Sequence, residues 1–202
     1  MNSKNQALIF IFLIVLYILL TATKQNVIKK EVSPKYDICI ISRFKNCNYL
    51  LPQWIQYHVF AGVDHFFLVD DCSTSNDRRE AFLFDCIDKG FCTITNASTS
   101  DCANERLHFK GMFSKYGTAC LWVSVIDPDE YIFPTQFNLD ISLYFLRRML
   151  QNTSEILFRM PWYVMTSNGY ENRPRGLLID NYISGEYTNH IKTMIKSNYV
   201  RE

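Results

Sequence analysis

Short apolar runs alternate with amphipathic stretches along the chain from about residue 36 onward. Runs rich in β-branched and aromatic side chains predict four strands, at residues 37–42, 65–69, 91–95 and 120–126. Between them, apolar side chains at helical spacing predict three helices, at residues 50–61, 78–89 and 104–116. This alternation predicts an α/β domain with a largely parallel sheet, whose first strand is buried on both faces.

The clearest helix signal covers residues 50–61. Pro52 lies in the predicted first turn and Gly62 follows the predicted end, the positions at which helices favour these two residues. His58 falls on the apolar face, so we expect it to pack in the core rather than bind a ligand. Trp54 and Tyr57 are likewise more typical of a core than of a platform for sugars.

The pattern is weaker after residue 126. A further helix is predicted at residues 139–150. Shorter apolar runs predict three more strands, at residues 156–160, 177–179 and 191–195.

The first part of the chain has a different character. Residues 7–22 (ALIFIFLIVLYILLTA) carry no charge and, extended by the next residues, approach the length of a bilayer core. We expect residues 1–23 to form a cytoplasmic tip and an uncleaved transmembrane signal anchor, residues 24–35 a polar stem, and residues 36–202 the folded domain. A cleaved signal peptide is the alternative, although Thr21-Ala22-Thr23 only partly matches a cleavage site.

Charge, cysteine content and glycosylation motifs indicate which partners and which cellular compartment suit this chain. With 21 basic and 20 acidic residues among 202, the net charge is +1, which argues against nucleic acid as the main partner. The chain has seven cysteines and no C-x-x-C pair, so a zinc ribbon is disfavoured, and we expect some of the cysteines to pair in an oxidising lumen. The triplets beginning at Asn96 and Asn152 match the N-glycosylation pattern, which fits a lumenal domain.

Acidic residues follow two of the predicted strands. Asp70 and Asp71 end the second strand, and Asp127-Pro128-Asp129 follows the fourth. Because ligands of open α/β sheets bind outside the carboxyl ends of the strands, we expect these side chains to converge there. Two carboxylates one residue apart can bind one Mg²⁺ or Mn²⁺ ion, which keeps coordination positions for phosphate oxygens. The alternative for Asp127 and Asp129 is a solvated turn, in which Asp and Pro are common.

Further residues near the first two strand ends could bind the rest of a nucleotide. Asp70 and Asp71 have the chemistry to accept hydrogen bonds from a ribose or a base. Arg43 follows the first predicted strand and is either a phosphate-binding residue or an ordinary surface base.

Several spaced motifs together point to a family. They are Arg43-Phe44-Lys45-Asn46, Trp54-Ile55, Tyr57-His58, Gly62-Val63-Asp64-His65-Phe66, Asp70-Asp71 and Asp127-Pro128-Asp129-Glu130-Tyr131. With these motifs in this order, residues 38–195 resemble the family 92 glycosyltransferases, relatives of the family 2-like group. The resemblance implies a GT-A-like nucleotide-sugar-binding domain on a single-pass type II anchor that faces the Golgi or ER lumen. It also implies inverting transfer of a sugar, most often galactose, from a UDP-sugar to a glycan acceptor, assisted by Mn²⁺ or Mg²⁺.

The resemblance also assigns roles to residues. It implies that Asp127 and Asp129 bind the metal and that four residues bind the donor nucleotide: Arg43, Asn46, Asp70 and Asp71. Cys47 departs from the pattern, since the family usually has Glu after that Asn.

Two features bear on activity. Inverting transfer needs a general base, and we expect Glu171 in this role, the alternative being an exposed loop glutamate. The resemblance further implies a metal-binding His beyond the last predicted strand, for which His190 is a poor positional match. We therefore expect the chain to be incomplete at its C-terminus, and a catalytically inactive binding or scaffold paralogue is the alternative to an enzyme.

Overall fold

The computed structural model describes residues 33–47, 49–74, 81–98, 100, 102, 104–134, 143–151 and 153–199. The chain divides into two units, Met1–Ser33 and Pro34–Glu202, and the described residues from Pro34 onward belong to the second. The expected anchor at residues 7–22 lies outside the described residues, as do most of the stem, Asn152 and the beginnings of two predicted helices. None of the helices within the described ranges is long and apolar enough to cross a membrane.

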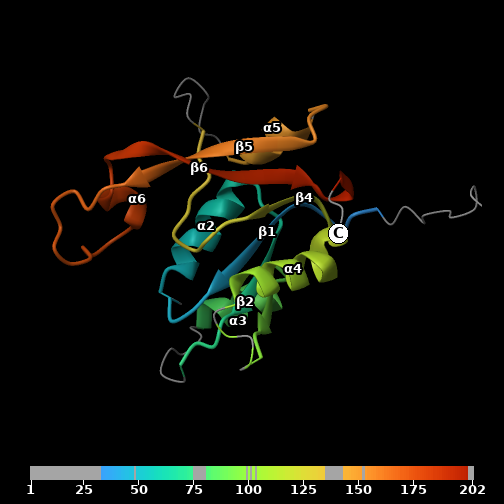
Figure 1. Ribbon diagram of the computed structural model, residues 1–202, viewed down its shortest axis with the longest axis horizontal. Helices are drawn as coiled ribbons and strands as arrows, with labels where there is room; N and C mark the ends of the chain where they lie inside the picture. The colour runs from blue at the N-terminus through green and yellow to red at the C-terminus, as the bar shows by residue number, and fades with distance from the viewer. Residues whose placement is uncertain are drawn as a thin grey trace, which may run out of the picture. The chain divides into compact units, whose positions relative to one another are not determined.

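Six strands of the described chain form one mixed sheet (Figure 1). They are β1 (Tyr36–Phe44), β2 (His65–Asp70), β3 (Cys92–Asn96), β4 (Cys120–Val125), β5 (Leu157–Met165) and β6 (Gly185–Lys196). The order is β3-β2-β1-β4-β6-β5. The first four strands pair in parallel, which confirms the expected α/β arrangement, whereas β6 runs antiparallel to both β4 and β5.

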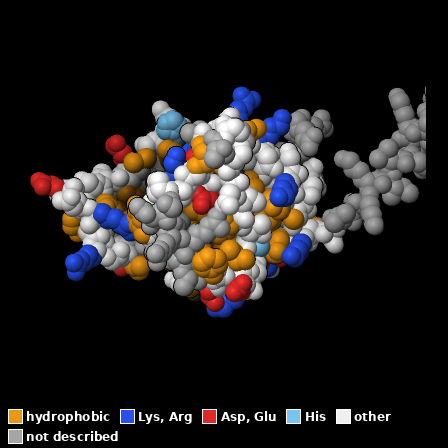
Figure 2. Space-filling model, turned by 90° about the horizontal axis from the view of Figure 1, so that it is seen from below, with side chains coloured by type: hydrophobic (Ala, Val, Ile, Leu, Met, Phe, Trp, Pro, Cys, Tyr) orange, Lys and Arg blue, Asp and Glu red, His pale blue; other side chains and the backbone are white. Residues whose placement is uncertain are grey.

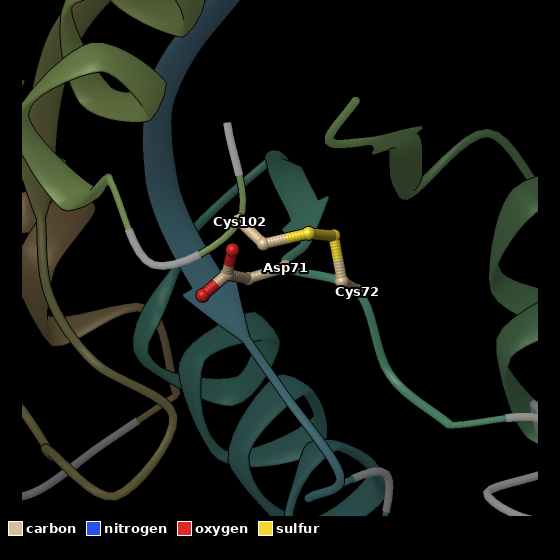
Figure 3. Close-up of side chains that lie close together, drawn as sticks. All are labelled: Asp71, Cys72 and Cys102. Carbon is tan, nitrogen blue, oxygen red and sulfur yellow. A yellow bond between two sulfur atoms is a disulfide. The ribbon is translucent and has the colours of Figure 1, made fainter. Parts of the chain in front are cut away.

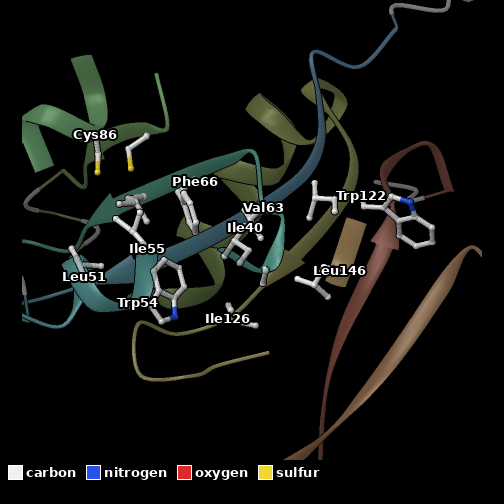
Figure 4. Close-up of a cluster of buried hydrophobic side chains, with 14 of the residues drawn as sticks. Ile40, Leu51, Trp54, Ile55, Val63, Phe66, Cys86, Trp122, Ile126 and Leu146 are labelled. Atoms are coloured by element: carbon white, nitrogen blue, oxygen red, sulfur yellow. The ribbon is translucent and has the colours of Figure 1, made fainter. Parts of the chain in front are cut away.

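Helices cover both faces of this sheet. They are α2 (Leu51–Ala61), α3 (Ala81–Asp88), α4 (Glu105–Tyr116), α5 (Phe145–Gln151) and the short α6 (Leu178–Asn181), with 3₁₀ turns η1 (Gly117–Ala119) and η2 (Ser197–Tyr199). Residues of α2, α3 and α5 pack with one set of strand side chains (Figure 4), and α4 packs with the other. The result is a three-layer arrangement with the parallel strands in the middle layer.

The burial of β1 follows directly from these layers. Ile38 and Ile40 point into the cluster beneath α2, while Cys39 and Ile41 point into the cluster beneath α4. All four are at most 1% exposed, so the continuous apolar run of this strand serves both faces. The expected burial of the first strand on both sides is confirmed.

The helix predicted at residues 50–61 is confirmed as α2. Pro52 lies in its first turn, and Gly62 ends it with a φ of 110°, a left-handed conformation that favours glycine. The Gly62 N–H donates to the carbonyls of His58 and Val59, which satisfies acceptors that a helix end otherwise leaves free.

One strand prediction is wrong. Residues 177–179 were expected to be extended, but Leu178–Asn181 form the short helix α6. The Tyr182 N–H donates to the Leu178 carbonyl across this helical turn, and the Asn181 amide donates to the carbonyl of Leu177. These local bonds replace the ladder that a strand would need. The strands predicted at residues 156–160 and 191–195 exist as the longer β5 and β6.

Cysteine pairing could not be read from spacing and is visible here. Disulfides join Cys39 to Cys120 and Cys72 to Cys102. Among the described residues, Cys86 and Cys92 are buried and form no disulfide. The expectation that some cysteines pair and that an odd one remains is therefore confirmed.

Candidate functional site

The parallel strands β1 to β4 direct their carboxyl ends to one side of the domain, here called the carboxyl side of the sheet. Ile41 of β1 pairs with Val125 of β4, and Phe44 of β1 pairs with Asp70 of β2. The residues that follow these strands therefore lie on the same side. A hollow of about 220 Å³ lies at the opposite end of the strands, beside Asp37 and Ile38, and is separate from this candidate site.

The residues after β4 form a closed loop, residues 127–130, here called the acidic turn. The Glu130 N–H donates to the Asp127 carbonyl at 3.0 Å, and the Asp127 N–H donates back to Glu130 Oε2 at 2.8 Å. Pro128 is buried within the turn, whereas Asp129 is exposed. The reciprocal bonds fix the backbone, so the carboxylates of Asp127 and Asp129 are presented from a rigid loop.

Helix α2 holds this turn from behind. Trp54 Nε1–H donates to the Glu130 carbonyl at 2.7 Å, and the Tyr57 hydroxyl donates to the Ile132 carbonyl at 2.9 Å. His58 lies between them, with Nδ1–H donating to the Trp54 carbonyl at 2.8 Å and Nε2 accepting from the Ile132 N–H at 3.3 Å. Trp54 and His58 are fully buried, as expected, whereas Tyr57 is half-buried, and the three residues connect the core to the acidic turn.

The same contacts set the protonation of His58. Nε2 must be unprotonated to accept from Ile132, which leaves the proton on Nδ1. The His58 ring is fully buried, and this burial lowers its pKa to about 4 although the bond to the Trp54 carbonyl favours the charged form. His58 is therefore neutral near pH 7 and has a fixed tautomer.

A lysine from β6 reaches the acidic turn. Lys192 Nζ donates to Asp127 Oδ2 at 3.2 Å, lies 3.1 Å from Glu130 Oε2, and sits 5.3 Å from the centre of the Trp162 ring. Burial opposes the charge on Lys192, but the two carboxylates outweigh it and raise the pKa of the ammonium. Burial also raises the pKa of Glu130, although Lys192 opposes this shift. Lys192 is thus a fixed cation beside the predicted metal-binding residues.

Sequence reasoning did not find this lysine as part of the acidic site. Ser124 of β4 pairs with Met194 of β6, and the antiparallel direction brings Lys192 alongside the residues that follow β4. Asp127 and Lys192 are 65 residues apart, so their contact depends on strand order. Lys192 lies on the strand predicted at residues 191–195, but that pattern gives no indication of which carboxylates it meets.

The acidic turn has the donors for a hard divalent cation. The Asp127 side chain is 36% exposed and Asp129 is also accessible, so both carboxylates can be reached from solvent. The turn carries three carboxylates, and Lys192 contributes one ammonium group to Asp127 and Glu130, which leaves a net negative charge that attracts a cation. Two carboxylates with water and phosphate oxygens are a donor set that suits Mg²⁺ or Mn²⁺.

Another cluster of metal-type ligands lies after β2 (Figure 3). Asp71, Cys72 and Cys102 place one ligand atom each within 4.8 Å of the others. The two sulfur atoms are joined in a disulfide, so they are not thiolate ligands. This cluster has the chemistry of a structural crosslink rather than of a metal site.

The Asp71 carboxylate instead contacts two side chains, those of Arg43 and His108. Its carboxylate is 3.1 Å from Arg43 Nη1 through Oδ2 and 3.2 Å from His108 Nε2 through Oδ1. Asp71 is 2% exposed and His108, from α4, is also buried. His108 is a contact that sequence reasoning missed, because its partner lies 37 residues away. Asp71 therefore holds the Arg43 guanidinium in place at the end of β1.

The remaining predicted donor residues tie the loops after β1 and β2 together. Asn46, at a positive φ of 50°, donates its N–H to Ser73 Oγ and accepts from the Thr74 N–H at 2.8 Å. Asp70 Oδ1 accepts from the Ser73 N–H at 2.9 Å. The structure thus brings the four predicted residues together, with part of their hydrogen bonding already used within the protein.

Glu171 lies in the segment between β5 and α6. Its side chain is exposed. Arg173, two residues later, stacks over the Tyr49 ring at 4.3 Å. The structure leaves the role of Glu171 as a prediction. His190, on β6, has its ring 5.3 Å from that of Trp162, near the Lys192 contact.

The surface seen in Figure 2 carries basic, acidic and apolar side chains interspersed among the described residues. This mixture agrees with the net charge of +1. A site for a negatively charged ligand therefore depends on local groups such as Arg43 and Lys192, and not on a broad basic field.

Comparison with known proteins gives a consistent result. The model of the family described as "Glycosyltransferase family 92" matches residues 34–202 of this chain. A curated protein from Ricinus communis, named as a glycosyltransferase family 92 protein, is 28% identical over 111 residues. That alignment covers 52% of this chain and 18% of the Ricinus communis protein, so the chain spans only a small part of that relative.

Proposed function

The chain belongs to glycosyltransferase family 92, and from this premise we propose that it transfers a sugar from a UDP-sugar to a hydroxyl group of a glycan acceptor. The observation that carries the proposal is the acidic turn at the carboxyl end of β4, fixed by reciprocal hydrogen bonds and supported by α2. Ligands of open parallel sheets bind on this side. A GT-A-like domain and a galactose-like donor sugar are parts of the same proposal.

Asp127 and Asp129 are the residues that would bind Mn²⁺ or Mg²⁺ in this function. The ion would supply positive charge to a diphosphate leaving group, a role typically worth several kcal/mol in the transition state. The acidic turn needs such a cation for a diphosphate to approach, since its three carboxylates otherwise repel phosphate. The rigid turn supports this role because it fixes both carboxylates before the donor arrives.

Arg43, Asn46, Asp70 and Asp71 would bind the nucleotide part of the donor. Asp71 is buried and accepts from Arg43 Nη1 at 3.1 Å, so it orients a guanidinium whose charge and planar shape suit a phosphate group. Asp70 and Asn46 shape the adjacent loops. Transfer with inversion would use a carboxylate base to take the proton of the acceptor hydroxyl, and Glu171 is the residue proposed for it.

The proposed location is a lumenal domain held on a single-pass type II membrane anchor in the Golgi or ER. The two disulfides support an oxidising compartment, since such bonds are rare in the cytosol. The uncharged segment at residues 7–22, extended by the next residues, approaches the length that the anchor needs.

The test is thermal unfolding of the full chain with UDP and Mn²⁺, each alone and together. A ligand that binds only the folded state raises the free energy of unfolding by about 2.7 kcal/mol when its concentration is a hundred times its Kd. We expect a rise in Tm that needs both components and that is lost in Asp127→Asn. Asp85→Asn is the matched control, because Asp85 is an exposed acidic residue of α3 that pairs with Lys89. Equal Tm values under all conditions would favour a binding or scaffold paralogue instead.

A further inference from the structure

Among the described residues, Lys192 is a basic side chain that contacts the acidic turn. Its ammonium group lies 3.2 Å from Asp127 Oδ2 and 3.1 Å from Glu130 Oε2. The Trp162 ring lies on another side, at 5.3 Å from its centre, where a cation interacts favourably with the ring electrons. Three neighbours, two from the acidic turn and one from β5, therefore hold the charge of Lys192 at a defined point.

The ammonium group has capacity left for a ligand. It carries three N–H donors, and the two carboxylates occupy two of them. The Lys192 side chain remains 23% exposed, on the side where β1, β2 and β4 end. Held in this way, the cation is organised in advance and loses little freedom when an anion arrives.

The charges of the turn argue for such a role. Asp127 and Asp129 suit a divalent ion, and an ion bound at Asp127 would compete with Lys192 for the same carboxylate. Glu130 still holds the ammonium group nearby, because its Oε2 also accepts from the Asp127 backbone N–H and belongs to the fixed turn. The lysine is then next to any phosphate that the ion attracts.

We propose that Lys192 is a phosphate-binding residue of the donor site, with its ammonium group contacting the diphosphate of the bound nucleotide. This inference rests on the proposed function. It differs from a purely structural role, in which Lys192 would only neutralise the acidic turn. In the structural role the lysine competes with the metal, so its removal would leave UDP binding unchanged or make it tighter.

The experiment measures the affinity of the full chain for UDP and for uridine, both with Mn²⁺, by isothermal titration calorimetry. Uridine keeps the base and ribose but lacks the diphosphate. The variants are Lys192→Met and Lys192→Gln, so that one of them can be studied if the other folds poorly. Lys196→Met is the matched control: Lys196 is on the same strand and lies 5.0 Å from the centre of the Trp122 ring, away from the turn.

We expect both Lys192 variants to weaken UDP binding by about tenfold or more, the usual size of a charge-assisted hydrogen bond, and to leave uridine binding unchanged. Lys196→Met should leave both affinities at the wild-type value. Unchanged or tighter UDP binding in the Lys192 variants would overturn the inference while the nucleotide proposal stands. If the wild-type chain binds neither UDP nor uridine, the proposed function fails and this inference fails with it.

Discussion

His58 makes the domain sensitive to acid. Protonation of Nε2 would place a proton against the Ile132 N–H and a charge in the core. Burial depresses the pKa of folded His58 from its ordinary 6.5 to about 4, so the unfolded state binds more protons between these values. The stability that neutral His58 contributes is therefore fully present above pH 6.5, falls as the pH drops through this window, and is lost below about pH 4.

The size of the effect follows from the same pKa values. A His58 pKa of about 4 in the folded state and 6.5 in the unfolded state lowers the free energy of unfolding by about 2 kcal/mol between pH 7 and pH 5. The assay is urea unfolding of the full chain at both pH values, for the wild type and for His58→Gln, which does not titrate.

For each protein, the free energy of unfolding at pH 5 is subtracted from the value at pH 7, and these differences are compared. Altered packing in His58→Gln affects both pH values and therefore cancels. We expect the variant to lose about 2 kcal/mol less than the wild type between pH 7 and pH 5. His190→Gln, at an exposed histidine of β6, is the matched control variant. An equal loss in His58→Gln and wild type would refute the reasoning that a neutral, buried histidine supports the acidic turn.

Three further substitutions test the fold around the site, each by urea unfolding. Asp71→Asn should lower the free energy of unfolding by about 3 kcal/mol, because it removes the charge of a buried carboxylate that contacts Arg43 and His108. An unchanged urea midpoint would mean that these contacts do not stabilise the fold. Cys72→Ser should lower the free energy of unfolding by about 3 kcal/mol, because it opens the crosslink to Cys102, which closes a separation of 30 residues; an unchanged urea midpoint would contradict this role. Gly62→Ala should lower the free energy of unfolding more than Gly90→Ala does. Both glycines have positive φ, but a Cβ added at Gly62 would lie 3.1 Å from the Arg147 side chain, whereas a Cβ added at Gly90 would meet no atom within 4 Å.

Local signals were sufficient for most of the parallel half of the domain. Proline in the first turn and glycine at the end bracket α2 because both act through local backbone geometry. The continuous apolar runs of β1, β2 and β4 predict strands buried on both faces, since only a sheet covered by helices tolerates them. The position of Asp127 and Asp129 at a strand end follows from the same pattern.

The remainder depends on contacts between distant segments. Residues 177–179 are apolar enough for a strand, yet local hydrogen bonds make them the start of a helix. The place of β6 beside β4 cannot be inferred from its own residues, so neither can the approach of Lys192 to the acidic turn. His108 reaches Asp71 in the same way, through the packing of α4 on the sheet.

The central claim is that Asp127 and Asp129 bind a metal ion together with a nucleotide diphosphate. Electron paramagnetic resonance measures it most directly, because free Mn²⁺ gives a strong signal that weakens when the ion is bound. We predict that the full chain with UDP binds one Mn²⁺, and that Asp127→Asn and Asp129→Asn abolish this binding. Two results would contradict the account. In the first, the wild-type chain with UDP leaves the Mn²⁺ signal unchanged. In the second, both variants bind Mn²⁺ as well as the wild type does.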